Sequence, residues 1–328
     1  MDDSIMESGL ETERIWGEYL GLITLADLNS QNEKGRIPEI IQICEVMHDR
    51  RMVQIADHIK KSGRRLILLA GPSSSGKTTT AKKLCIHLRA IGLKPVYLGV
   101  DDYYKERDEI PFGEDGTQDF EAISAIDTEL FNRQVADILD GKTVDVPHFD
   151  FISGKKIFGQ RQVCAGKDRP LVIEGILALK DELTAHLPEE EKFYLYTCPL
   201  SSLKQIDGSR VKRGDIRKIR RLVRDHAKRG WDLEQTFSMW PKVRAGEDVN
   251  IFPYSKKADE IFNSSQPYEL AVLKKHAMPL LAEVEKGHKY YGEAQRLKKL
   301  LDQVDSIEDE SGIEADAVIR EFIGGGSL

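Results

Sequence analysis

Hydrophobic residues in this chain follow two patterns, and the change from one to the other lies near residue 64. Within residues 36–62, apolar side chains recur at intervals of three and four, which predicts one amphipathic helix. Pro38 suits the first turn of this helix, and the pair Ser62–Gly63 suits its end. Beyond it, short and nearly continuous apolar runs alternate with amphipathic stretches. The expected strands are 65–71, 95–100, 170–175, 192–197 and 258–264, and the expected helices are 78–90, 127–140, 213–229, 232–245 and 267–284.

Strands that are apolar along their whole length and separated by helices are typical of a parallel sheet covered on both faces. The pattern therefore predicts an α/β fold. We expect an N-terminal helical segment at 1–62, an α/β domain at 63–285 and a C-terminal helical tail with two further helices at 286–328. Two long segments, 103–121 and 145–169, are rich in Gly, Asp, Pro and Lys, as in loops that carry function or form lids.

The stretch GPSSSGKT, from Gly71 to Thr78, satisfies the pattern GxxxxGK[ST] between an expected strand and an expected helix. Its glycines let backbone N–H groups turn inward around a phosphate, and the helix that follows adds its N-terminal dipole. Lys77 can reach the β- and γ-phosphates, and the Thr78 hydroxyl can bind Mg²⁺. This context argues against a chance glycine turn. The predicted nucleotide-binding residues are Gly71, Ser73, Ser74, Ser75, Gly76, Lys77, Thr78 and Thr79.

The motif alone does not distinguish kinases from other P-loop proteins. The sequence contains no NKxD element of the kind that reads the base in GTPases, and no LSGGQ-type signature of transport ATPases. Both classes are therefore disfavoured.

Two carboxylates stand at the ends of expected strands. Asp101 directly follows the second strand, and Glu174 closes the third. Because ligands of open parallel sheets bind at the carboxyl ends of the strands, both lie near the phosphate loop. There a carboxylate can accept a proton from an attacking hydroxyl or hold Mg²⁺. The alternatives are a solvated or helix-capping aspartate and a glutamate tied to a backbone turn.

The helix expected at 213–229 carries a cationic face. Arg217, Arg221, Arg224 and Lys228 lie on one side, and Ile219, Leu222, Val223 and His226 lie on the other. Arginines at this spacing can clasp a polyphosphate and stabilise charge in phosphoryl transfer. A solvated basic face and a nucleic-acid contact are the alternatives.

Composition limits the partners of the chain. Its net charge is −7, which argues against nucleic acid as an obligate partner. No apolar run approaches the roughly 18 residues of a membrane helix, and the N-terminus lacks the apolar region of a signal peptide. The four cysteines show no zinc-ligand spacing, which favours reduced thiols. We therefore expect a cytoplasmic protein, and the sequence leaves homo-oligomer formation open.

Several stretches together resemble the uridine kinase and phosphoribulokinase family of P-loop kinases, over roughly residues 64–285. The matching stretches, in order, are GPSSSGKTT, DDYYK at 101–105, DFEAISAID at 119–127, VPHFDF at 146–151, IEGIL at 173–177 and RRLVRDHAKRGWDLEQ at 220–235. The segments 16–29 and 35–59 also resemble the linker of kinases that carry a threonyl-tRNA-synthetase-like region upstream.

This resemblance implies a phosphotransferase that uses ATP and Mg²⁺ to phosphorylate a hydroxyl of a small molecule. Asp101 matches the catalytic base, and Thr78, Asp101 and Glu174 match the positions around Mg²⁺. Lys77, Arg221, Arg224 and Arg229 match residues at the phosphates.

The acceptor side departs from the pattern of pyrimidine nucleoside kinases. The aspartate that holds the ribose is matched by Glu121, and the tyrosine, histidine and glutamine that read the base are matched by Phe149, Gly154 and Met239. Tyr104, in the DDYYK stretch, is expected on the same side. Three polar contacts thus become apolar or absent, and a site that loses hydrogen-bonding groups changes its specificity.

These departures favour an acceptor that is nucleoside-like or another small hydroxyl compound. One alternative is a true uridine or cytidine kinase with a rearranged base pocket. Another, from a different class, is a regulatory nucleotide-binding module without efficient transfer, which the presence of Asp101 and Glu174 argues against.

Overall fold

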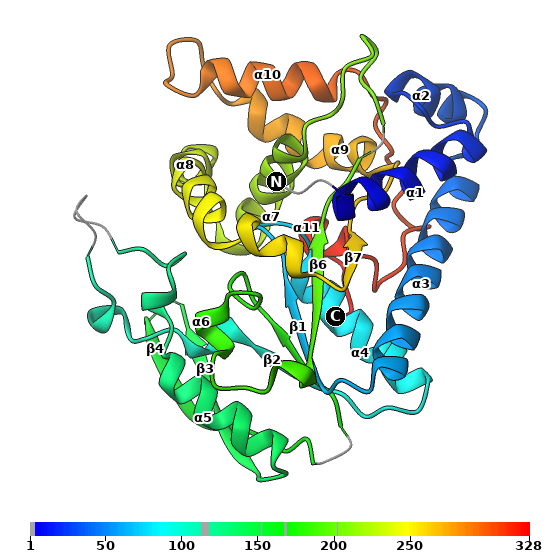
Figure 1. The fold of residues 1–328 in the computed structure, drawn as a ribbon. Coiled ribbons are helices and arrows are strands. Elements are labelled where there is room, and N and C mark those ends of the chain that lie inside the picture. The colour runs from blue at the N-terminus through cyan, green and yellow to red at the C-terminus, as the bar shows by residue number, and fades with distance from the viewer. Residues whose placement is uncertain (1–3, 113–117, 152, 167–168, 202) are drawn as a thin grey trace.

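The computed structural model describes residues 4–112, 118–151, 153–166, 169–201 and 203–328. Its centre is a parallel five-stranded sheet with the strand order β2-β5-β1-β6-β7 (Figure 1). The strands are β1 (Leu66–Ala70), β2 (Val96–Gly99), β5 (Leu171–Glu174), β6 (Lys192–Cys198) and β7 (Glu260–Asn263). The predicted α/β fold is confirmed, and each of the five expected strands is present.

Helices cover both faces of this sheet because its strands are apolar on both sides. Ile67 and Leu69 of β1 pack toward α3 and α4, whereas Leu66 and Leu68 pack toward α5 and α6. These helices are α3 (Ile37–Ser62), α4 (Lys77–Ala90), α5 (Thr128–Leu139) and α6 (Asp181–Thr184). As expected, α3 has a proline in its first turn and ends at Gly63, whose φ of 69° is left-handed.

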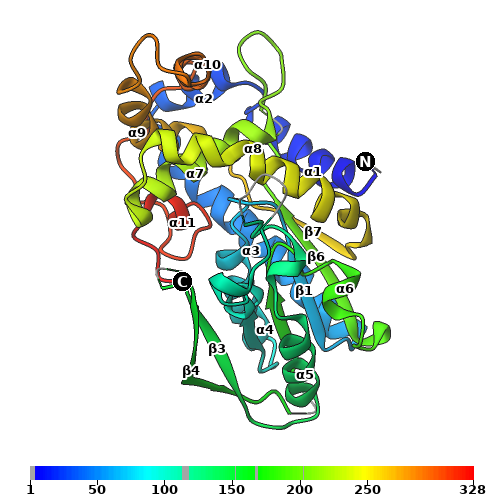
Figure 2. The ribbon, with the colours of Figure 1, turned by 90° about the vertical axis from the view of Figure 1, so that its left-hand side faces the viewer.

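A second layer of helices has its own hydrophobic core and lies beyond the carboxyl ends of the strands (Figures 1 and 2). It comprises α2 (Leu25–Glu33), α7 (Arg213–Arg229), α8 (Leu233–Asn250), α9 (Glu269–Ala282) and α10 (Tyr291–Leu301). Ile219, Leu222 and Val223 of α7 are buried, as predicted. The expectation that His226 belongs to this apolar face is wrong, because the last turn of α7 reaches solvent.

The segment expected as a long loop at 145–169 contains an antiparallel hairpin. Its strands are β3 (Val144–Asp150) and β4 (Lys155–Val163), and the second is largely exposed. Gly154 makes the turn with a φ of 71°. The other long segment, 103–121, contains one short 3-10 turn at Arg107–Glu109, and its residues 113–117 lie outside the described part of the chain.

The two ends of the chain pack against this body. Helix α1 (Ser4–Leu20) precedes α2, and the C-terminal segment ends in the short helix α11 (Arg320–Ile323) beside α7. None of the four cysteines forms a disulfide in this structure. Within the described ranges, no helix is long and apolar enough to cross a membrane.

Candidate active site

The phosphate loop joins β1 to α4, and its shape depends on glycine. A side-chain carbon at Gly71 would lie 2.1 Å from the carbonyl oxygen of Thr197, so no larger residue fits there. Gly76 has a φ of 78°, and Ser74 is a buried non-glycine residue with a φ of 59°. Positive φ is costly for serine and is found mainly where the surroundings enforce it. The loop is therefore held in a defined conformation by its neighbours.

The register of the sheet places Glu174 beside this loop. Glu174 ends β5 and pairs with Leu69 of β1 on one side and Gly99 of β2 on the other. Its carboxylate accepts hydrogen bonds from Thr78 Oγ1 at 3.2 Å and from the Tyr97 hydroxyl at 3.1 Å. Burial raises the pKa of Glu174 to about 7, although the ammonium of Lys77 lowers it. The predicted metal-site residues Thr78 and Glu174 are thus in direct contact.

Asp101 lies in the 3-10 turn Val100–Tyr103 that follows β2. Asp101 as a whole residue is exposed. Partial removal of its carboxyl group from water raises the pKa of Asp101, and the ammonium of Lys77 opposes this rise. The neighbouring Asp102 is already engaged, because its Oδ1 lies 3.1 Å from His148 Nδ1 and accepts from the Phe149 N–H. Among the described residues, none makes a hydrogen bond to the Asp101 carboxylate.

Three arginines of α7 hold the phosphate loop from the other side. Arg221 Nη1 donates to Ser73 Oγ at 2.8 Å, so this predicted residue lies beside the loop. Arg217 Nε donates to the Ser73 carbonyl at 2.8 Å, and Arg220 donates to the Ser74 carbonyl at 3.3 Å. The sequence pattern placed Arg217 on the cationic face of this helix but gave no role to Arg220. Both lie on turns of α7 that face the loop, and both are buried.

The other predicted arginines gather around one buried carboxylate. Asp225 pairs with Arg221 at 3.2 Å, with Arg224 at 2.7 Å and with Arg229 at 3.3 Å. Three guanidinium groups around one carboxylate leave an excess of positive charge beside the loop, which suits a polyphosphate. Lys228, on the same helix, is exposed.

Two carboxylates that the sequence did not indicate contact the start of helix α4 and the phosphate loop before it. Glu247 of α8 accepts from the Ser73 N–H at 3.1 Å, and Glu321 of α11 accepts from the Thr79 N–H at 3.3 Å and from its hydroxyl at 2.9 Å. Val318, near Glu321, packs against Gly76. The contacts of Glu247 and Glu321 join segments more than 170 positions apart in sequence, so no local sequence pattern predicts them. The C-terminal tail is therefore part of the nucleotide side of the site.

The residues expected on the acceptor side include packed aromatic rings. Tyr104 and Phe149 are buried with ring centroids 5.5 Å apart, and the Tyr104 hydroxyl donates to the Phe120 carbonyl at 2.8 Å. Phe151 packs 5.1 Å from Phe149 and remains 57% exposed. The predicted residues Tyr104 and Phe149 are thus neighbours, and the tyrosine hydroxyl is already committed to the backbone.

Glu121 is the unsatisfied polar group of this side. Its Oε2 is buried and has no hydrogen-bond partner among the described residues. Burial raises the pKa of Glu121 to about 7, while Arg221 lowers it. Gly154 lies in the hairpin turn against Arg107, and Met239 is 41% exposed on α8. These positions supply no hydrogen-bonding side chain for a base.

Comparison with known proteins agrees with this geometry. Residues 66–271 match the Phosphoribulokinase / Uridine kinase family. The uridine kinases of Macrococcus caseolyticus (strain JCSC5402) and Ligilactobacillus salivarius (strain UCC118) are 28% and 29% identical over 208 residues, which are 63% of this chain and 91% and 88% of theirs.

Among solved structures, a possible uridine kinase from Bacillus stearothermophilus is 19% identical with a TM-score of 0.45, covering 65% of this chain and 98% of that chain. The family match spans more than half of the chain and includes the phosphate loop, both strand-end carboxylates and helix α7. The chain belongs to the phosphoribulokinase / uridine kinase family and is a P-loop phosphotransferase that acts on a hydroxyl group.

Proposed function

We propose that this protein transfers the γ-phosphoryl group of ATP to a hydroxyl of a small polar acceptor, with Asp101 as the general base and Mg²⁺ as the metal. The observation that carries the proposal is the contact of Thr78 with Glu174 on the strand between the phosphate loop and Asp101. It brings the loop, a buried carboxylate and an exposed carboxylate to one edge of the sheet.

The donor groups at this edge fit a magnesium ion. Thr78, Asp101 and Glu174 offer only hydroxyl and carboxylate oxygens, the ligands that Mg²⁺ prefers together with phosphate oxygens. When bound, the metal neutralises charge on the transferred phosphate. Burial raises the pKa of Glu174 to about 7, and a nearby cation would stabilise its ionised form.

The remaining groups position ATP and offset charge. Lys77 and the N–H groups of the loop bind the phosphates, and Arg221 and Arg224 lie where negative charge increases during transfer. Asp101 takes the proton as the acceptor oxygen bonds to the γ-phosphorus and the bond to the departing ADP oxygen breaks. Positioning and electrostatics account for most of the catalysis in such a reaction.

The acceptor is defined by Glu121 and the aromatic rings. A buried carboxylate oxygen without a partner can accept a hydrogen bond from a hydroxyl of the acceptor, which favours a polyol, ribose-like or hydroxy-acid part. Phe149 has no hydroxyl and Gly154 has no side chain, so a pyrimidine would leave its polar edge without partners from these positions. We therefore infer that uridine and cytidine are poor acceptors.

The test is an acceptor screen followed by one pair of variants. Nucleosides, sugars, polyols and hydroxy-amino acids are offered with Mg·ATP, and ADP release is measured. With the best acceptor, Asp101→Asn should lower kcat by ~10²-fold or more, the usual scale for loss of a general base, while ATP affinity persists.

Asp102→Asn is the matched control, because Asp102 is held by His148 and the Phe149 backbone. Near-normal kcat in Asp101→Asn with a large loss in Asp102→Asn would assign the base to Asp102. Nucleotide binding without ADP release for every acceptor would instead indicate a regulatory module.

A further inference from the structure

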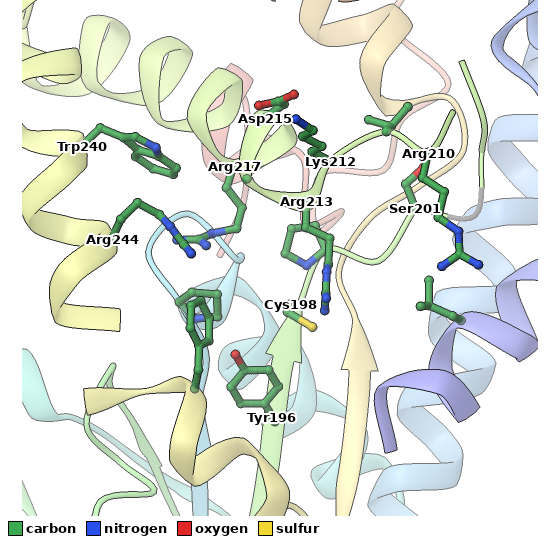
Figure 3. Close-up of a pocket in the computed structure, with 16 residues that line it drawn as sticks. Tyr196, Cys198, Ser201, Arg210, Lys212, Arg213, Asp215, Arg217, Trp240 and Arg244 are labelled. Carbon is green, nitrogen blue, oxygen red and sulfur yellow. The ribbon is translucent and has the colours of Figure 1, made fainter. Parts of the chain in front are cut away.

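A cavity of about 490 Å³ lies between the end of β6, the segment that leads into α7, and α8 (Figure 3). Trp240 and Arg244 of α8 line it. Gly246, on another side of the same helix, packs against Glu121, where a side-chain carbon would lie 2.7 Å from the glutamate Cβ. The cavity and the acceptor side are therefore separated by α8. Its volume is in the range of small-molecule sites.

The lining of this cavity is strongly cationic. Its charged residues are Arg210, Lys212, Arg213, Arg217 and Arg244, with Asp215 as the acidic member. Asp215 already pairs with Arg296 at 2.7 Å, and Arg217 and Arg244 share Glu247. No described carboxylate forms an ion pair with Arg210, Lys212 or Arg213. The cavity thus has positive charge that the described carboxylates do not neutralise.

A buried hydroxyl also faces the cavity without a partner. Tyr196 of β6 is 1% exposed, and its hydroxyl oxygen has no hydrogen-bond partner among the described residues. Figure 3 shows this hydroxyl pointing from β6 into the space between α8 and Arg213. A buried polar group without a partner is costly, and native structures rarely keep one without a reason. An acceptor atom of a ligand would satisfy it.

Apart from Ser201 and Tyr196, the uncharged lining is apolar or aromatic. Trp240, Phe252, Pro72 and Pro199 form walls between the charged groups. Small-molecule sites typically combine such walls with a few convergent polar groups. Guanidinium groups match phosphate oxygens in geometry as well as in charge.

We propose that this cavity binds a small organic phosphate: a phosphate ester whose charged group lies against Arg213 and Tyr196 and whose apolar body lies against the aromatic walls. The site is distinct from the phosphate loop but adjacent to it, because Pro72 and Arg217 line the cavity while Arg217 Nε holds the Ser73 carbonyl. A ligand that binds Arg217 changes the hydrogen bond by which Arg217 holds the phosphate loop. Occupancy therefore alters nucleotide affinity, and nucleotide alters ligand affinity by the same factor.

The experiment uses phenyl phosphate as the probe and benzyl alcohol as its uncharged counterpart, both titrated by calorimetry into the full chain. The variant Lys77→Ala weakens phosphate binding at the loop and so isolates the cavity. We expect one binding event for phenyl phosphate in Lys77→Ala and none for benzyl alcohol. In the Lys77→Ala background, Arg213→Gln should weaken the affinity for phenyl phosphate at least tenfold, and Tyr196→Phe should weaken it severalfold. The control Arg133→Gln, on the exposed side of α5, should leave this affinity unchanged.

Three results would overturn the proposal. The first is no binding to the wild-type chain at millimolar probe. The second is binding that Lys77→Ala abolishes, which places the probe on the phosphate loop. The third is equal affinity in the Arg213→Gln, Tyr196→Phe and Arg133→Gln variants, which makes the contact a nonspecific charge effect. Tyr196→Phe removes one oxygen only, so it retains the fold if Arg213→Gln does not.

Discussion

The nucleotide side and the acceptor side of this active site are built differently. On the nucleotide side, hydrogen bonds fix the loop. Ser73 has three partners, which are Arg217, Arg221 and Glu247, and Thr79 is bound by Glu321. On the acceptor side, the rings of Tyr104, Phe149 and Phe151 pack together, and Glu121 keeps an oxygen without a partner among the described residues.

The two sides differ because they have different tasks, which are phosphate binding and recognition of the acceptor. Phosphate binding needs fixed N–H groups and cations, so the loop is over-determined by its neighbours. Recognition of the acceptor needs groups that pair only when the acceptor is present, and we propose that Glu121 is such a group. On this proposal the nucleotide side carries the features of the family, and the acceptor side determines the substrate.

The largest expected effect lies on the nucleotide side. Lys77→Ala should remove nearly all transfer, by ~10³-fold or more, because it removes the ammonium group that we expect to bind the phosphates. Calorimetry should show weaker ATP binding. Lys82→Ala, one turn along α4, is the control and should retain both properties. Unchanged ATP affinity and activity in Lys77→Ala would break the assignment of the loop.

A smaller loss is expected from the arginines of α7. Arg221→Ala and Arg224→Ala should each lower kcat by ~10²-fold and raise the KM for ATP less, because their contacts strengthen as charge develops. Steady-state kinetics with varied ATP measures both constants. Lys228→Ala is the control, since Lys228 is exposed. Equal and small effects at all three positions would show that the helix is only a charged support.

The kcat/KM for the acceptor should depend on pH through Glu121. The pKa of Glu121 is raised to about 7, by burial first and by the nearby Glu247 and Asp101, against Arg221 and Lys77, which lower it. Glu121 is therefore protonated below pH 7 and becomes a full hydrogen-bond acceptor above it. The kcat/KM for the acceptor should rise between about pH 6 and pH 8.

Glu121→Gln should flatten this rise and lower kcat/KM by about tenfold at pH 8, the scale of one hydrogen bond to a charged group. The KM for ATP, measured in the same buffers, is the control. A pH profile that Glu121→Gln leaves unchanged would remove Glu121 from the acceptor site.

The sequence predicts where the nucleotide-side residues lie relative to strands and helices because the patterns that mark them are local. Gly71–Thr78 form one contiguous motif, and Asp101 and Glu174 follow strands whose apolar runs are easy to recognise. The strand order, which the sequence pattern does not give, places Glu174 between the strands that precede the loop and Asp101, as its pairing with Leu69 and Gly99 shows.

The features that the sequence did not predict depend on tertiary contacts. The hairpin β3–β4 has an exposed second strand, so its pattern is too polar to be recognised as a strand. Glu247 and Glu321 reach the loop from helices distant in sequence. The alignment of Gly154 and Met239 likewise depends on loop lengths that local patterns do not determine.

The central claim is that a uridine-kinase-like nucleotide side is joined to an acceptor side that does not read pyrimidines. The most direct measurement is kcat/KM for uridine beside that of the best acceptor in the screen, under the same Mg·ATP conditions. We predict that uridine is ~10²-fold worse or more, because two or three polar groups of the base find no partner at Phe149, Gly154 and Met239. A uridine kcat/KM near ~10⁵ M⁻¹s⁻¹ that no other acceptor surpasses would contradict the account.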